Sequence, residues 1–118
     1  MSGDTFGDVL AGLAGVGWDF GIASFDGDSL VICAGTSIEY AEPIVKLGGV
    51  SYLELPTEFS HAVFSIASNE QRDLLGRRVP LEADDVVVRI EAETMAVLET
   101  QCFFVVASSA QSVRTARS

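Results

Sequence analysis

The residues of this sequence that could perform chemistry are few and far apart. The only histidine, His61, directly follows Ser60 in a stretch of apolar and small residues. A histidine that acts as a general base needs a nucleophile or a substrate proton within hydrogen-bond reach. Neighbouring residues on a strand point to opposite faces, so Ser60 and His61 do not form a dyad. We therefore assign no catalytic residue.

The two cysteines, Cys33 and Cys102, lie 69 positions apart, and each is inside an apolar run. Redox and zinc motifs need sulfur or imidazole ligands whose spacing lets them converge, for example a Cys-x-x-Cys pair. With His61 the cysteines make at most a three-ligand set that has no such spacing. We expect both cysteines to be buried structural thiols.

Two groups of carboxylates could attract a cation. Asp26-Gly27-Asp28 lacks the further spaced acids and the closing glutamate of a calcium-binding loop, so we expect a tight turn there. Leu81–Asp85 packs three acids into four positions and would need Glu54 or Glu58 nearby to form an oxygen-rich metal site. We interpret it as a solvated connection, and we predict neither a metal nor a cofactor.

Arg72, Arg77 and Arg78 form the one cationic cluster. Arginine binds carboxylates and phosphates with two parallel hydrogen bonds. Acids close in the sequence offer a simpler partner, and we expect the arginines to pair with Glu70, Asp73 and Glu82.

Aromatic and charged residues near turns could anchor a partner protein. Tyr52 is out of phase with Leu53 and Leu55 and is expected to face outward, whereas Trp18 is expected in the core. The candidate interaction surface consists of Tyr40, Tyr52, Glu54, Glu58, Arg77 and Arg78.

Composition and charge narrow the class of protein. The chain has 118 residues, 48% of them apolar and 20% charged, which fits one globular domain and excludes disordered and fibrous classes. The net charge is -10, which disfavours nucleic acid as a partner. Residues 1–71 hold ten acids and one lysine, a charge of -9, while residues 72–118 hold seven acids and six arginines. No signal segment or bilayer-length apolar run is visible, so we expect no membrane association and a cytoplasmic location.

The hydrophobic periodicity predicts the elements that position these residues. A helical period covers 4–16, and an Asp-Gly turn joins strands at 18–23 and 30–34 into a hairpin. Further strands are expected at 37–40, 50–55 and 59–67, the last two as antiparallel partners. Asn69 is expected to cap a short helix that runs through Leu75, and 77–85 is a connection.

The clearest alternation lies in 86–93, where Val86, Val88, Ile90 and Ala92 share the core face and Val87 and Arg89 share the wet face. Residues 94–96 turn the chain, 97–107 form the returning strand, and the pattern is lost from Ser108. The predicted fold is α+β, with an N-terminal helix packed on a mostly antiparallel, meandering sheet of about five to seven strands. We expect a single domain over 1–111 and a flexible tail over 112–118.

The order of elements supports one resemblance. A helix, the strand Gly17-Trp18-Asp19-Phe20-Gly21-Ile22, the middle strand 49–56 and the last strand Phe103–Ala107 together resemble small bacterial α+β immunity proteins of polymorphic toxin systems. The likeness extends over about residues 5–110. It implies a non-enzymatic protein that neutralises a partner by covering its active surface, and the acidic first block suits a basic partner.

The sequence therefore favours an acidic, non-enzymatic binding module. We expect it to bind a protein partner or to associate with a second copy as a homodimer. Two alternatives remain open. One is a small-ligand-binding or enzymatic pocket between helix and sheet, recognisable by a deep cavity with converging polar groups. The other is a structural subunit of an oligomer, recognisable by a large, flat apolar patch.

Overall fold

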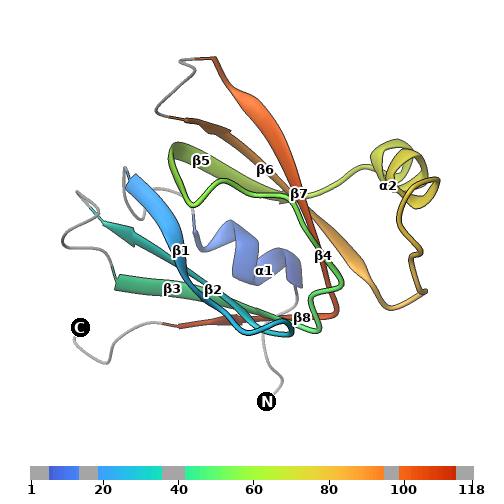
Figure 1. Cartoon of the computed structure of the whole chain (residues 1–118), viewed down its shortest axis with the longest axis horizontal. Helices are drawn as coiled ribbons and strands as arrows, with labels where there is room; N and C mark the ends of the chain where they lie inside the picture. The colour runs from blue at the N-terminus through green and yellow to red at the C-terminus, as the bar shows by residue number, and fades with distance from the viewer. Residues whose placement is uncertain (1–5, 14–18, 36–41, 95–98, 114–118) are drawn as a thin grey trace.

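The computed structural model describes residues 6–13, 19–35, 42–94 and 99–113, which form two short helices and eight strands (Figure 1). The described strand pairs are all antiparallel, so a mostly antiparallel sheet with short helices is confirmed, although eight strands exceed the expected five to seven. The helices are α1 (Phe6–Ala11) and α2 (Asn69–Gly76). The strands are β1 (Asp19–Phe25), β2 (Leu30–Gly35), β3 (Glu42–Gly48), β4 (Tyr52–Leu53), β5 (Glu58–Ile66), β6 (Val86–Glu93), β7 (Gln101–Ala107) and β8 (Ser109–Ser112).

The β1–β2 hairpin forms as the Asp-Gly signal predicts. Asp26 accepts hydrogen bonds at Oδ1 from the backbone N–H groups of Asp28 (2.9 Å) and Ser29 (2.7 Å). Gly27 has a φ of 95°, a conformation that residues with a side chain rarely adopt. Each residue type in the turn therefore has a physical reason to be there.

The strand order is β4-β7-β6-β5-β1-β2-β3-β8, which is not a simple meander. The expected pairing of 59–67 with 50–55 is wrong, because β5 pairs with β1 and β6. Of 50–55 only Tyr52–Leu53 is a strand, and its partner is β7. Pro56 lacks a backbone donor and cannot extend that ladder.

The sheet closes on itself. Its edge strand β4 continues β3 from the other end of the strand order, and its edge strand β8 continues β7 in the same way. β4 follows β3 after three residues, and β8 follows β7 after Ser108 alone. β3 pairs with β8 and β4 pairs with β7. Between these ladders Ser108 donates its backbone N–H to Gly48 O at 2.9 Å, and Ser51 donates to Val106 O at 3.0 Å. The two segments are therefore paired along their length with a bend in the middle.

The inside of the closed sheet is the main core. Its buried side chains are apolar and come from every strand except β4 and β8. Leu30, Ile32, Val45, Val88 and Val105 are among those with no exposed surface. No polar or charged side chain of the described residues is buried. The core is thus stabilised by apolar burial, without an internal polar network.

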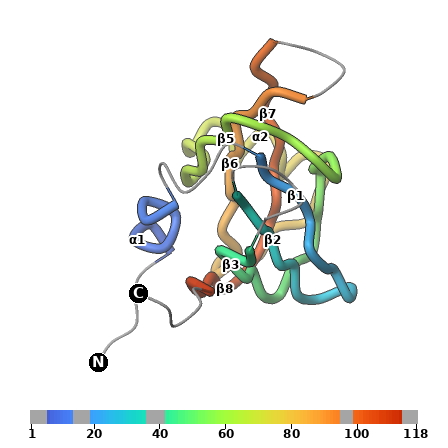
Figure 2. Tube along the Cα trace, turned by 90° about the vertical axis from the view of Figure 1, so that its left-hand side faces the viewer, coloured from blue at the N-terminus to red at the C-terminus, as the bar shows by residue number. Residues whose placement is uncertain are grey.

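Helix α1 packs on the closed sheet between β5 and β8 (Figure 2). Val9, Leu10 and Leu13 bring the predicted apolar face into the main core. The helix ends at Ala11, before the expected end at 16, and the chain continues as a turn in which Leu13 donates to Leu10 O at 3.1 Å. Glycine disfavours helix, and Gly12 stands at this point. The expected start at Asp4 lies outside the described residues.

Helix α2 covers part of the outer surface of the sheet and forms a second, smaller core there. Leu75 packs on Val87, which is 2% exposed, and on Val106, which has no exposed surface. Val87 was expected on the wet face of its strand, and that expectation is wrong because α2 covers it. Val88, Ile90 and Ala92 are buried on the core face as predicted.

The N-terminus of α2 has a complete capping box, but Ser68 and not Asn69 is the capping residue. The Ser68 hydroxyl accepts from the Gln71 backbone N–H (3.1 Å), and the Gln71 side chain accepts from the Ser68 N–H (3.0 Å). The connection after α2 carries no helix or strand through 77–85, as predicted.

The C-terminal region is more ordered than the sequence pattern indicates. The alternating pattern is lost from Ser108, yet Ser109–Ser112 form β8 and Val113 donates its backbone N–H to Ile44 O at 3.0 Å. These residues pair through their backbone, which needs no apolar alternation. The expected strand at 37–40, Trp18, most of the 94–96 turn and residues 114–118 of the tail lie outside the described residues.

Candidate functional site

His61 lies at an irregularity of β5 and pairs with an acid of the neighbouring strand. The register between β5 and β6 shifts between Ser60 and Val63, and His61 has a φ of 52°. Its Nδ1 atom is 3.3 Å from Glu93 Oε1, and 54% of its side chain is exposed. The ring is thus on the surface beside a carboxylate, which gives an ion pair when the histidine is protonated.

The two cysteines differ from the expected pair of buried thiols. Cys33 is half-buried and donates its thiol to Gly21 O at 3.4 Å, whereas Cys102 is exposed. The expectation is wrong for Cys102 because the β6–β7 register places it opposite Glu91, on the outer face of the sheet. Both cysteines are free.

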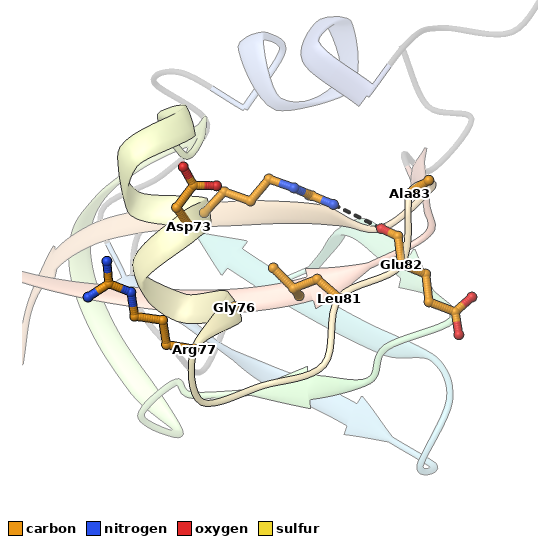
Figure 3. Close-up of a pocket in the computed structure, with 7 residues that line it drawn as sticks. Asp73, Gly76, Arg77, Leu81, Glu82 and Ala83 are labelled. Carbon is orange, nitrogen blue, oxygen red and sulfur yellow. Dashed lines mark hydrogen bonds between the residues drawn. The ribbon is translucent and has the colours of Figure 1, made fainter.

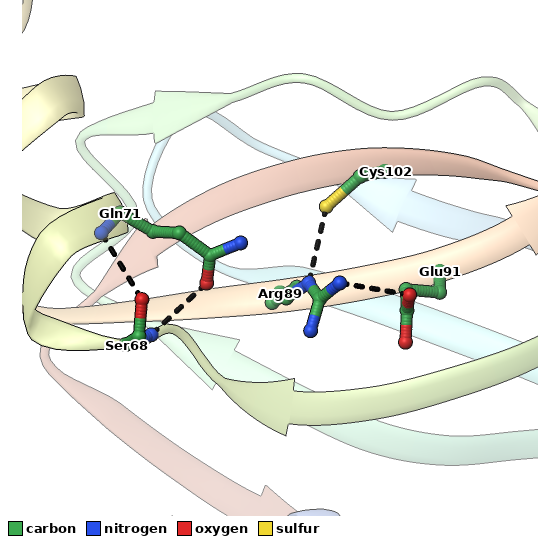
Figure 4. A network of polar contacts seen from close by, with 5 residues as sticks. All are labelled: Ser68, Gln71, Arg89, Glu91 and Cys102. Atoms are coloured by element: carbon green, nitrogen blue, oxygen red, sulfur yellow. Dashed lines mark hydrogen bonds and ion pairs between the residues drawn. The ribbon is translucent and has the colours of Figure 1, made fainter.

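Arg89 forms a small polar network with Cys102 and Glu91 on this outer face (Figure 4). Its Nε–H donates to Cys102 Sγ at 3.3 Å, and its Nη2 lies 2.8 Å from Glu91 Oε2. The hydrogen bond to Cys102 is the largest cause that raises the pKa of Arg89 above its ordinary value. Arg89 therefore stays charged and is held on the β6–β7 surface.

The arginines of the cationic cluster do not pair with nearby acids as expected. Arg72 donates to the backbone carbonyls of Glu82 and Asp85, so it holds the connection after α2. The backbone carbonyls of a connection have no partner in a strand ladder, so they compete with carboxylates for the hydrogen-bond donors of Arg72. Within the described ranges, neither Arg77 nor Arg78 has an ion pair with a carboxylate.

Two hollows flank α2. The first, of about 380 Å³, is lined by Arg72, Asp73, Arg77 and the 81–83 stretch, and Figure 3 shows Arg77 on the opposite side of Leu81 from Glu82. The second, of about 470 Å³, is more apolar, and we call it the α2 groove. The α2 groove is lined by Gln71, Leu74, Leu75, Arg78, Cys102 and Phe104.

An acid of the connection after α2 makes a hydrogen bond within that connection. Asp85 accepts at Oδ2 from the Glu82 backbone N–H at 2.9 Å. Glu54, one of the acids that could have completed a metal site, accepts instead from the Tyr52 hydroxyl at 3.0 Å. Across the parts of the chain that the structure describes, no group of three or more His, Cys, Asp or Glu side chains could hold a metal ion.

The tip of the β1–β2 hairpin presents an aromatic ring beside two carboxylates. We call Phe25, Asp26 and Asp28 the hairpin tip. Phe25 is 43% exposed, and both acids are exposed. The backbone hydrogen bonds from Ser29 and then Asp28 lower the pKa of Asp26 below its ordinary value of 3.8. Asp26 therefore keeps its negative charge across the neutral pH range.

The structure only partly unites the predicted interaction surface. Tyr52 and Glu54 are hydrogen-bonded to each other, and Tyr52 is half-buried against the second core. Arg78 lines the α2 groove, whereas Glu58 lies opposite Gly21 on another part of the sheet. Arg77 lines the other hollow, and Tyr40 lies outside the described residues.

Sequence reasoning missed four exposed large apolar residues of the described chain, which are Phe25, Val63, Ile66 and Leu74. Phe25 is 43% exposed and Leu74 is 53% exposed. One signal was available for Leu74. Adjacent residues on a helix point about 100° apart, so when Leu75 faces the core, Leu74 lies at the edge of the buried face or outside it.

Comparisons with models of protein families, with curated proteins and with solved structures found no significant match to the chain. Neither described helix is long and apolar enough to cross a membrane.

Proposed function

We propose that the chain is a non-enzymatic binding module of the immunity type, which neutralises a basic protein partner by covering its active surface. It acts in the cytoplasm, and its contact with the partner is centred on the hairpin tip. The observation that carries this proposal is Phe25, which is 43% exposed beside Asp26 and Asp28.

A large aromatic ring held at the end of a hydrogen-bonded hairpin is a suitable anchor for a protein interface. Aromatic anchors contribute much of the energy of protein interfaces when they enter a pocket on the partner. The turn bonds of Asp26 fix the hairpin before binding, so little conformational entropy is lost on association.

The charge of the first block, residues 1–71, favours a basic partner. Residues 1–71 contain ten acids and only Lys46 as a cation. Carboxylates that stay ionised attract a basic surface over a distance of about one Debye length, which is about 10 Å at 0.1 M salt. Such attraction raises the association rate and rejects acidic surfaces.

The test uses the product of the gene next to this one in the native host. Expressed alone, that product should arrest growth, and co-expression of this chain should restore it. The purified pair should form a stoichiometric complex whose affinity falls as salt rises. A harmless neighbour that forms no complex with this chain contradicts the proposal.

A matched pair of double variants locates the contact. Asp26→Asn with Asp28→Asn should raise the dissociation constant about tenfold at low salt, as expected for loss of charged contacts at an interface. Glu82→Gln with Asp84→Asn removes the same charge from the connection after α2 and should change it less than about twofold. Equal effects of the two double variants would mean that total charge, and not the hairpin tip, governs binding.

A further inference from the structure

The outward side of α2 carries an acid, an apolar residue and a base at steps of four. Glu70, Leu74 and Arg78 are all exposed. Residues four apart lie on one side of a helix, about 6 Å apart along its axis. Arg78 donates its backbone N–H to Leu75 O at 2.9 Å, so the helical turn continues past the C-cap at Arg77. Arg78 therefore lies one turn beyond Leu74, and both residues line the α2 groove.

This row of three residues is complementary to itself. When two such helices lie antiparallel about a two-fold axis at Leu74, Glu70 of each copy faces Arg78 of the other. The two charge pairs are equivalent, as a closed two-fold interface requires. We propose that α2 is the contact surface of a symmetric homodimer, in which the occupant of the α2 groove is a second copy of this chain.

Local charge supports a second copy at this position. Residues 69–78 contain two acids and three arginines, a charge of +1, although the whole chain carries -10. Two copies of so acidic a chain repel each other over most of their surfaces, and residues 69–78 add no net negative charge to that repulsion. Arg78 has no ion pair with a described carboxylate of its own chain, so its donors are available to Glu70 of the other copy.

The shape of the surface fits the same arrangement. Leu74, which is 53% exposed, stands on the border of the α2 groove, and Phe104 and Cys102 form its opposite wall. About the two-fold axis, Leu74 of each copy would enter the groove of the other. The projecting residue and the hollow that receives it then belong to one surface, which is the condition for an isologous contact.

The test is the oligomeric state of the full chain and of three variants by sedimentation equilibrium. A two-turn helix buries little area, so the wild type should dimerise between about 10 μM and about 1 mM. Glu70→Arg and Arg78→Glu each turn both charge pairs into repulsive ones and should weaken the dimer about tenfold or more. The double variant with both changes restores both pairs and should dimerise within about threefold of the wild type.

Mixing the two single variants provides a test that does not depend on their stability. One variant then presents two bases and the other two acids, so the mixed dimer has two attractive pairs and each parent dimer has two repulsive ones. An equimolar mixture should form heterodimers at concentrations where each variant alone is monomeric. Circular dichroism shows that the variants are folded.

Three outcomes would overturn the proposal: a wild type that is monomeric at the highest concentration, single variants that dimerise as well as the wild type, or a mixture that stays monomeric. The inference is independent of the proposed function, since Asp26→Asn with Asp28→Asn changes the hairpin tip and should leave self-association unchanged.

Discussion

Gly49 and Ser108 face each other where the two longest segments of the sheet bend. Gly49 has a φ of 64°, and a Cβ atom placed on it would contact the Ser108 hydroxyl and lie 3.2 Å from Ser108 Cβ. The neighbouring Gly48 accepts the Ser108 backbone N–H at 2.9 Å. This contact joins the β3–β8 ladder to the β4–β7 ladder and so closes the sheet.

Replacing Gly49 with alanine should therefore destabilise the protein by more than backbone strain alone. A non-glycine residue in the left-handed region costs about 1–2 kcal/mol, and overlap with Ser108 adds to that cost. Urea unfolding should show a loss of about 2–4 kcal/mol for Gly49→Ala.

Two variants separate strain from overlap. Gly27 has a φ of 95° but nothing within 4 Å of its added Cβ, so Gly27→Ala should show only the strain cost. Changing Ser108 to glycine in the Gly49→Ala background should recover part of the loss. If Ser108→Gly recovers none of the loss in the Gly49→Ala background, the close approach to Ser108 has no energetic role.

The same bend explains which parts of the fold could be predicted from the sequence. The β1–β2 hairpin and the core face of β6 follow from local alternation and an Asp-Gly turn, and both were predicted. β4 and β8 form because Gly49 and Ser108 meet across about sixty residues, and no local pattern reports such a pairing. Ser109–Ser112 are polar, so periodicity gives no sign that they form a strand.

The candidate surfaces were predictable to a similar extent. Arg78 and Glu54 were singled out by residue type, but the sequence could not show that Arg72 would bind carbonyls of the following connection and leave Arg78 without a carboxylate. Nor could it show that α2 would cover Val87, since periodicity tells which residues share a face and not what packs against that face.

The capping box of α2 gives a second prediction. Ser68→Ala removes the acceptor for the Gln71 N–H and should cost about 1 kcal/mol in the free energy of unfolding. Asn69, the capping residue expected from the sequence, is the first residue of the helix, so Asn69→Ala should stay within about 0.5 kcal/mol of the wild type. Thermal or urea unfolding of both variants checks the difference. A larger loss of stability for Asn69→Ala than for Ser68→Ala would show that Ser68 is not the capping residue.

Asp26 gives a prediction on pH. Its folded pKa is lowered by backbone hydrogen bonds from Ser29 and Asp28, so it contributes stability above its unfolded pKa of about 3.8. That contribution is lost as the pH falls through the lower, folded pKa. Asp26→Asn should therefore be less stable than the wild type at neutral pH, and the difference should shrink in acid below 3.8.

Two measurements check the behaviour of Asp26. Urea unfolding of both proteins at neutral and acidic pH gives the difference in stability, and an NMR titration follows the carboxyl group directly. A titration midpoint at or above 3.8 would show that the turn does not favour the ionised form.

Leu74 and Leu75 are neighbours on α2 with opposite roles, and alanine at each position should separate stability from association. Leu75 is 3% exposed and covers Val87 and Val106, so Leu75→Ala should cost about 2–4 kcal/mol by leaving a cavity in the second core. Leu74 is 53% exposed, so Leu74→Ala should change stability by less than about 0.5 kcal/mol while it weakens the dimer. Urea unfolding below the concentration of dimerisation, together with sedimentation equilibrium above it, measures both effects. Comparable losses of stability at the two positions would mean that Leu74 packs on its own chain, and the surface offered to a second copy would then be lost.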